Sequence, residues 1–398
     1  MENKLSDRIN NQTESQTLAM TRLSRELVAE GKDVINLSIG EPDFDTPQLI
    51  KDAAKKAIDE NYTHYTPVPG YPELRKAISN KFKRDNKLDY SPEQIVVSTG
   101  AKQSLANIAL SIINPGDEVI ILAPYWVSYS EIIKLAEGKS IVLPSTITTD
   151  FKVSTAQIKA AITDKTRMLW FSSPCNPSGS VYIKEELFEI ANLIKDYPNI
   201  LIVSDEIYEH IVFSGKHESI AQFDFIKNQV ITVNGVSKGY AMTGWRIGYI
   251  GAPKWIADAC TKMQGQFTSG TCSIAQKAAQ AALEADPSIT FEMCHSFKKR
   301  RDLVLSLLSE IPGLKLNQPK GAFYIFADVT AYFGKSDGTT TIKNPTDLTM
   351  FLLNKALVAI VTGEAFGDPN CVRFSYATSE KILVESIQRI KRTLELLH

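Results

Sequence analysis

The sequence has few cysteines, and they form no recognisable pattern. No two of them make a Cys-x-x-Cys pair or show the spacing of metal ligands, and their number is odd. This usage excludes a fold built on disulfides, predicts no metal site, and favours a reducing compartment. The five are Cys175, Cys260, Cys272, Cys294 and Cys371. We therefore expect a cytoplasmic protein.

The sequence also lacks long apolar runs and an excess of either charge. No stretch approaches about 18 consecutive apolar residues, and the polar start, Met1 to Arg8, has no signal-peptide core. Lys and Arg number 44 and Asp and Glu 45, so the formal net charge is −1. These absences predict no membrane segment and no nucleic-acid partner, and they favour small-molecule partners.

No internal repeat or low-complexity linker divides the chain, but its 398 residues exceed what one core usually holds. Short apolar strands alternate with helical stretches from about residue 61 to 280, which predicts an α/β domain with a mainly parallel sheet. Later strands at 321–326 and 371–375 indicate a smaller α+β domain. We place an N-terminal arm with part of the small domain at residues 1–45, a large domain at 46–285, and a small C-terminal domain at 286–398.

The most informative stretch is SKGYAMTGWRIG, from Ser237 to Gly248. Lys238 follows an apolar run and lies among small residues that let the backbone approach a ligand. A catalytic lysine needs burial or a neighbouring cation, because its ordinary pKa is near ~10.4. Arg246, eight residues later, offers that cation and a fork that suits a phosphate. Taken alone, a solvated lysine and a structural arginine explain the stretch equally well.

Three other strands end at a side chain suited to chemistry. Asp205 follows the apolar run 200–203, and a buried carboxylate there needs a partner. Trp126 follows the strand expected at 117–123, where its ring either stacks on a ligand or fills the core. Asn176 lies between Pro174 and Pro177, so its amide is rigidly held unless the segment is a plain turn.

Loops and one late strand supply the remaining candidates. Gly100-Ala101-Lys102 joins a strand to a helix, and such a helix N-terminus attracts phosphate, although many α/β proteins contain this junction. Gly40 begins a loop rich in proline, and Tyr65 lies in another such loop. Arg373 lies in the last strand, where burial requires a carboxylate, either from a structural ion pair or from a ligand.

Together these stretches resemble the class I aminotransferases of fold type I, which depend on pyridoxal 5′-phosphate (PLP). The resemblance covers about residues 15 to 395 and keeps the order of the family's motifs. It is closest to the bacterial gamma-type aspartate aminotransferases, on the segments PYWVSY, SDEIYEH and VSKGYAMTGWRIGYI. The fold it implies is a large, mainly parallel domain with a smaller α+β domain.

The resemblance implies roles for the candidate residues in cofactor binding. Lys238 carries PLP as a Schiff base and is the catalytic acid and base, while Asp205, 33 residues earlier, pairs with the ring nitrogen. Asn176 and Tyr208 bind the phenolic oxygen, and Trp126 lies against the ring. Phosphate contacts are implied for Gly100, Ala101, Lys102, Ser237 and Arg246, and for Tyr65 from the neighbouring subunit. The implied assembly is therefore at least a homodimer.

The same resemblance implies a substrate site. Arg373 binds the α-carboxylate, Gly40, Trp126 and Asn176 lie against the substrate, and Lys102 binds the distal carboxylate of aspartate or glutamate. The expected reaction is transamination of L-aspartate and 2-oxoglutarate to oxaloacetate and L-glutamate. Alternatives are an aminotransferase for aromatic amino acids, kynurenine or prephenate, and a PLP-dependent β-lyase. A regulator on this fold usually carries a DNA-binding domain, for which the arm leaves no room.

Overall fold

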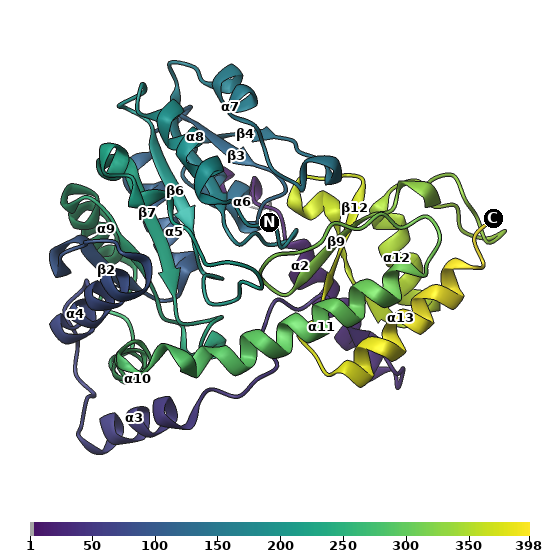
Figure 1. Cartoon of the computed structure of the whole chain (residues 1–398), viewed down its shortest axis with the longest axis horizontal. Helices are drawn as coiled ribbons and strands as arrows, with labels where there is room; N and C mark the ends of the chain where they lie inside the picture. Colours follow the sequence, from purple (N-terminus) through teal and green to yellow (C-terminus); the bar gives the residue numbers. More distant parts are fainter. Residues whose placement is uncertain (1–3) are drawn as a thin grey trace.

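The computed structural model describes residues 4–398; residues 1–3 of the expected arm lie outside the described residues. Figure 1 shows two units joined side by side, with the long helix α11, Phe291–Ser309, running along both. One unit is built on a large sheet and the other on smaller sheets near the C-terminus. The arm begins with α1, Asp7–Asn10, and α2, Gln16–Ala29.

The large unit contains a seven-stranded sheet in the order β2-β8-β7-β6-β5-β3-β4. Strands β3 to β7 are parallel to one another, whereas β8 is antiparallel to both β7 and β2. The predicted mainly parallel sheet is therefore confirmed. Its strands are β2 Ile95–Ser98, β3 Glu118–Leu122, β4 Lys139–Leu143, β5 Thr166–Ser172, β6 Leu201–Asp205, β7 Val230–Gly235 and β8 Gly248–Gly251.

Helices cover both faces of this sheet because successive strand residues point to opposite faces. In β3, Ile120 and Leu122 belong to one core and Val119 and Ile121 to the other. The first core includes residues of α3 Gln48–Asp59, α4 Pro72–Lys81, α7 Thr155–Ala161, α8 Lys184–Ile194 and α10 Ser273–Glu284. The second includes residues of α5 Ala101–Ile112, α6 Ser128–Leu135 and α9 Lys254–Phe267.

The C-terminal unit packs α11, α12 Pro345–Lys355 and α13 Glu380–Leu394 around a third core. Its antiparallel sheet has the order β11-β12-β9, with bounds β11 Val361–Thr362, β12 Cys371–Ser375 and β9 Tyr324–Asp328. The arm joins this unit, since β1 Ile35–Asn36 pairs in parallel with β10 Val358–Ala359. The domain boundaries at 45/46 and 285/286 stay predictions.

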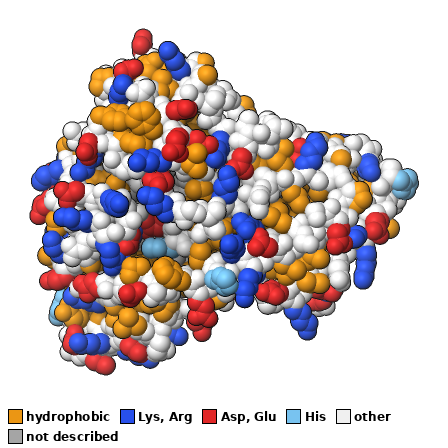
Figure 2. All heavy atoms as spheres, viewed as in Figure 1, with side chains coloured by type: hydrophobic (Ala, Val, Ile, Leu, Met, Phe, Trp, Pro, Cys, Tyr) orange, Lys and Arg blue, Asp and Glu red, His pale blue; other side chains and the backbone are white. Residues whose placement is uncertain are grey.

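The surface gathers no single kind of charge on the face seen in Figure 2, where basic and acidic side chains are interspersed. Within residues 4–398, no helix is long and apolar enough to cross a membrane. The same residues contain no group of His, Cys, Asp and Glu side chains arranged to hold a metal ion.

Candidate active site

The candidate site lies at one edge of the seven-stranded sheet. Parallel strands direct their carboxyl ends to the same edge, where ligands of open α/β sheets bind. Trp126 lies just beyond β3, Asp205 ends β6, and Lys238 lies just beyond β7. This convergence explains why side chains far apart in the sequence share one site.

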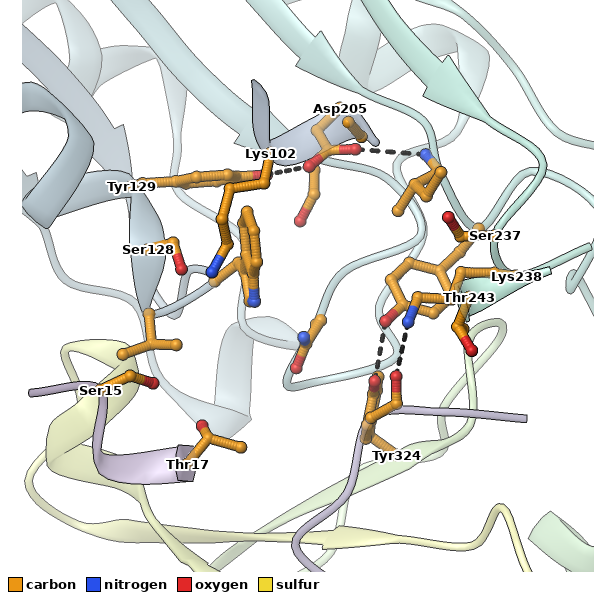
Figure 3. Close-up of a pocket in the computed structure, with 18 of the residues that line it drawn as sticks. Ser15, Thr17, Lys102, Ser128, Tyr129, Asp205, Ser237, Lys238, Thr243 and Tyr324 are labelled. Atoms are coloured by element: carbon orange, nitrogen blue, oxygen red, sulfur yellow. Dashed lines mark hydrogen bonds between the residues drawn. The ribbon is translucent and has the colours of Figure 1, made fainter. Parts of the chain in front are cut away.

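A cavity of about 250 Å³ opens at this edge. Figure 3 shows Lys102 and Tyr129 on one side of it and Ser237, Lys238 and Thr243 on the other. Every predicted site residue except Gly100 and Tyr65 lines the cavity. The lining residues that the sequence predicted are Gly40, Ala101, Lys102, Trp126, Asn176, Asp205, Tyr208, Ser237, Lys238, Arg246 and Arg373.

Gly100 is the N-cap of α5, directly before Ala101 and Lys102, which line the cavity. Its φ is +82°, and a Cβ at this position would collide with the guanidinium of Arg246. Glycine therefore lets Arg246 lie against the backbone where the helix begins. A guanidinium beside unpaired helix N–H groups forms a corner suited to a phosphate.

Tyr65 takes no part in the cavity of its own chain. Its side chain is 100% exposed, so packing within the chain does not explain it.

Lys238 is the amine of the site. Its Nζ donates a hydrogen bond to the carbonyl oxygen of Gly40 at 2.5 Å (Figure 3). Burial lowers the pKa of Lys238 to about 8, with the negative charge of Glu41 opposing this shift and the positive charge of Arg246 adding to it. About a fifth of the amine is therefore unprotonated at pH 7.4, far more than at the ordinary pKa of a lysine.

Asp205 is the buried acid of the site, with 4% of its surface exposed. The hydroxyl of Tyr129 donates to Oδ2 at 2.7 Å and the backbone N–H of Ile207 donates to Oδ1 at 3.2 Å. Burial nevertheless raises the pKa of Asp205 to about 6, because these bonds offset only part of the lost hydration. Within residues 4–398, no basic side chain forms an ion pair with this carboxyl group, which leaves it suited to a cationic ligand.

Arg373 is a buried cation, 1% exposed. Its Nη1 donates to Oδ1 of Asn176 at 2.9 Å and its Nη2 to the carbonyl oxygen of Ser38 at 2.5 Å, while Nε has no partner. No carboxylate of residues 4–398 pairs with it. Because an uncompensated buried charge is costly, this guanidinium indicates a site for a carboxylate ligand.

The bond from Arg373 also fixes the role of the Asn176 amide. Since Oδ1 accepts from Arg373, the Nδ2 group of Asn176 is left as a donor beside the cavity. In this orientation the Nδ2 group can donate a hydrogen bond to an acceptor oxygen of a ligand in the cavity.

The ring of Trp126 and the side chain of Lys102 form another wall. Nζ of Lys102 lies 4.9 Å from the centroid of the Trp126 ring, within range of a cation–π contact. Burial lowers the pKa of Lys102, and the charge of Arg246 lowers it further.

Several lining residues were not predicted from the sequence. They are Ser15, Thr17, Leu18, Val127, Ser128, Tyr129, Ser172, Ile207, Thr243 and Tyr324. Tyr129 had a usable signal, because it follows Trp126 by three residues at the start of α6. Ser15 and Thr17 had none, since only the folded arm brings them to the cavity.

Comparisons with known proteins place this arrangement in a family. The model of the family described as aminotransferase class I and II matches residues 32–390. A bifunctional aspartate aminotransferase and glutamate/aspartate-prephenate aminotransferase from Petunia hybrida is 47% identical, covering 98% of this chain and 82% of that protein. The aspartate/prephenate aminotransferase of Nitrosomonas europaea is 46% identical, covering 98% of this chain and all of that protein.

Solved structures agree. The aspartate aminotransferase of Rhizobium meliloti has a TM-score of 0.96 at 42% identity, covering 99% of this chain and 100% of that one. The aspartate aminotransferase of Thermus thermophilus with maleate has a TM-score of 0.92 at 38% identity, covering 98% of this chain and 99% of that one. The sheet, with its lysine and its acid at the carboxyl edge, thus defines a PLP-dependent enzyme of fold type I. More narrowly, the chain belongs to the aminotransferase class I and II family.

The residues present fit PLP. Asp205 has no cationic partner among residues 4–398, and a protonated ring nitrogen would supply one, while Lys238 provides the amine. Gly100 leaves the space that brings Arg246 to the N-terminus of α5, where a phosphate is favoured. The buried Oγ of Ser172, at the end of β5, lines the cavity and has no partner.

Proposed function

We propose that this aminotransferase transfers the amino group of L-aspartate to 2-oxoglutarate, giving oxaloacetate and L-glutamate. The observation that carries the proposal is the buried guanidinium of Arg373, which no acidic side chain of residues 4–398 neutralises, in one cavity with the amine of Lys238. An amino acid brings the carboxylate that Arg373 needs and the amine that exchanges with Lys238. Relatives with 46% and 47% identity carry aspartate in their names.

Each predicted cofactor residue has a proposed task. Arg246, Ser237 and the N-terminus of α5, Gly100-Ala101-Lys102, hold the phosphate. Asp205 holds a proton on the ring nitrogen, Trp126 packs on the ring, and Asn176 and Tyr208 donate to the phenolic oxygen. Bound PLP supplies a ring that withdraws electrons from the substrate Cα.

Lys238 has two tasks in sequence. Its side-chain amine would hold the cofactor until the amino group of the substrate takes its place. Once free, this amine would act as general base and then general acid for the proton of the substrate Cα, and its lowered pKa of about 8 leaves part of it unprotonated near neutrality. Arg373 keeps the α-carboxylate fixed while this proton moves.

The acidic preference rests on Lys102. Its ammonium group lies over the ring of Trp126 in the wall of the cavity, where a second carboxylate of aspartate or glutamate would meet a positive charge. Prephenate is a second candidate amino acceptor, because two of the relatives above carry prephenate in their names.

The experiment is an absorbance spectrum of the purified PLP-loaded protein, recorded before and after addition of aspartate and then of 2-oxoglutarate. The proposal expects the visible band of lysine-bound PLP to disappear with aspartate and to return with the oxo acid. A band that ignores aspartate but responds to aromatic amino acids or kynurenine would contradict the substrate assignment. Oxo acid released without any acceptor would indicate a β-lyase.

We further propose a homodimer with shared active sites. Tyr65 is fully exposed in the single chain, and a hollow lined by Thr99, Arg246 and Cys272 lies next to the phosphate corner. Tyr65 of the neighbouring subunit would reach the phosphate there. Sedimentation at micromolar concentration tests the assembly, and a monomer would contradict it.

The proposed location is the cytoplasm. All five cysteines lie in the described part of the chain and are free, which supports a reducing compartment. Fractionation of the native cells tests this location, and recovery of the enzyme outside the cytoplasmic fraction would contradict it.

A further inference from the structure

Tyr324 lines the cavity, although none of the roles above uses it. It is the first residue of β9, and its side chain is 0% exposed. A buried tyrosine hydroxyl normally has a hydrogen-bond partner, and here the partner is the hydroxyl of Tyr208 at 2.7 Å (Figure 3). The two residues are 116 positions apart, and their bond joins the end of the large sheet to the small sheet.

The position of the Tyr324 hydroxyl is tightly constrained. A Cβ at Gly40 would lie 2.6 Å from this oxygen, so only glycine leaves room for it. The carbonyl group of Gly40 in turn accepts the hydrogen bond from Lys238. Tyr324 is therefore in contact with the segment that holds the reactive amine.

The ring of Tyr324 has a second neighbour in the site. The Cζ of Arg373 lies 4.6 Å from the ring centroid, a cation–π distance for a guanidinium that is itself buried. In the antiparallel pair β9 and β12, Ser375 is opposite Tyr324 and Arg373 is opposite Phe326. Arg373 is thus a diagonal neighbour on the same sheet face.

We propose that Tyr324 is a positioning residue for transamination, which acts on the cofactor through the hydroxyl of Tyr208. This inference rests on the proposed function of the site. When the hydroxyl of Tyr208 donates a hydrogen bond to the phenolic oxygen of PLP, its own oxygen is left to accept a hydrogen bond from the hydroxyl of Tyr324. A hydroxyl that accepts one hydrogen bond donates a stronger one, because the chain of bonds is polarised.

The expected consequence concerns the nitrogen that joins Lys238 to the cofactor. A stronger bond to the phenolic oxygen draws negative charge away from this nitrogen and lowers its pKa. Burial raises the pKa of both Tyr208 and Tyr324, so both hydroxyls stay neutral donors over the working pH range. The charged groups that act on Lys238 are Glu41, Arg246, Arg373 and Asp205, and Tyr324→Phe changes none of them.

The test is a pH titration of the visible absorbance of the PLP-loaded enzyme without substrate. Tyr324→Phe is expected to raise the apparent pKa of the nitrogen that joins Lys238 to PLP, read from the visible absorbance, by about half a unit or more. Tyr208→Phe is expected to raise the same pKa by a larger amount. The double variant Tyr208→Phe/Tyr324→Phe is expected to match Tyr208→Phe alone, because Tyr324 acts only through Tyr208.

Two measurements separate this role from a structural one. Phenylalanine keeps the ring beside Arg373, so the affinity of Tyr324→Phe for maleate, a dicarboxylate without an amino group, is expected to stay within about twofold of wild type. The matched control is Tyr332→Phe, a buried tyrosine of the same unit whose hydroxyl donates to the carbonyl of Pro312 at 2.6 Å. The visible absorbance of Tyr332→Phe is expected to change with pH at the same apparent pKa as that of the wild-type enzyme.

An unchanged pKa in Tyr324→Phe, or additive shifts in the double variant, would overturn the role of Tyr324 and leave the proposed function intact. Absence of the visible band from the wild-type protein incubated with PLP would instead contradict the proposed function.

Discussion

At the scale of single residues, burial shifts the pKa values of the site's amine and its buried acid towards pH 7, downwards for the amine and upwards for the acid. The pKa of Lys238 falls to about 8 and that of Asp205 rises to about 6. Both shifts have the same main cause, since a buried site disfavours the charged form of either group. Part of the amine is therefore an unprotonated nucleophile near neutral pH. The buried carboxylate, in turn, would be stabilised by a cationic ligand.

Replacing Lys238 by alanine removes both the group that holds the cofactor and the group that moves the proton. We expect Lys238→Ala to lower kcat by at least about a thousandfold, because general acid–base catalysis alone contributes about 10²–10⁴-fold and the covalent hold on the cofactor is lost as well. Steady-state turnover and the melting temperature are the measurements, with Lys254→Ala on the exposed face of α9 as control. Appreciable turnover by a folded Lys238→Ala protein would contradict its role.

Asp205→Asn is expected to stabilise the protein without PLP while abolishing turnover. The folded pKa of about 6 exceeds the ordinary value of 3.8, so the buried carboxylate costs stability above pH 6 and nothing below both values. Asparagine removes this cost, up to about 3 kcal/mol at pH 7.5, and the difference should vanish by about pH 3.5.

Urea unfolding of the apoprotein at both pH values measures this difference, and the exposed Asp258→Asn serves as control. Equal stabilisation of Asp205→Asn at both pH values would contradict a titration of Asp205.

Lys102→Ala tests the acidic preference. If Lys102 pairs with the distal carboxylate, its loss is expected to raise the KM for aspartate by about tenfold or more, the usual size of a charged hydrogen bond. The KM for alanine, which has no distal carboxylate, is expected to change by less than about twofold. Equal effects on the two amino acids would show that Lys102 plays another part.

At the scale of an element, the N-terminus of α5 depends on the absence of a side chain at Gly100. The backbone there has φ +82°, and the space that a Cβ would fill is taken by Arg246. The helix supplies N–H groups and the arginine a charge, so the phosphate corner requires both at once.

Gly100→Ala is therefore expected to weaken PLP binding by about tenfold or more, through displacement of Arg246. Gly116→Ala is a matched control, because Gly116 has φ +86° and an added Cβ there meets nothing within 4 Å. Both positions have a positive φ, so both variants place a side chain in a backbone conformation that L-residues rarely adopt. Spectral titration of the apoprotein with PLP gives the comparison, and equal losses of affinity would contradict the steric argument.

At the scale of the whole molecule, the proposed dimer would supply Tyr65 of one chain to the site of the other. Tyr65 contacts nothing that buries it within its own chain, and Arg246 lines both the cavity and the adjoining hollow. A second chain that covers this hollow would complete the phosphate corner.

Tyr65→Phe is expected to weaken PLP binding by about tenfold, the cost of one hydrogen bond to a charged group, while sedimentation still reports a dimer. Unchanged PLP affinity in the variant would remove Tyr65 from the site, whatever the assembly.

The sequence by itself determined the large sheet and the residues that end its strands. The apolar runs predicted the strands that precede Trp126, Asp205 and Lys238, which are β3, β6 and β7, and their bounds put the three residues at one edge. Local spacing suffices for this, because the direction of a parallel strand fixes where its last residue lies. The motifs likewise indicated Arg373 and Asn176 as separate candidates.

Only the tertiary structure decided which distant atoms meet. Asn176 and Arg373 are 197 residues apart and Gly40 and Lys238 are 198 apart, yet each pair is hydrogen bonded. The bond between Tyr208 and Tyr324, like the approach of Ser15 to the cavity, had no counterpart in any local pattern. Such contacts follow from how the arm and the two sheets pack, and a single sequence records composition and spacing but not the relative placement of distant elements.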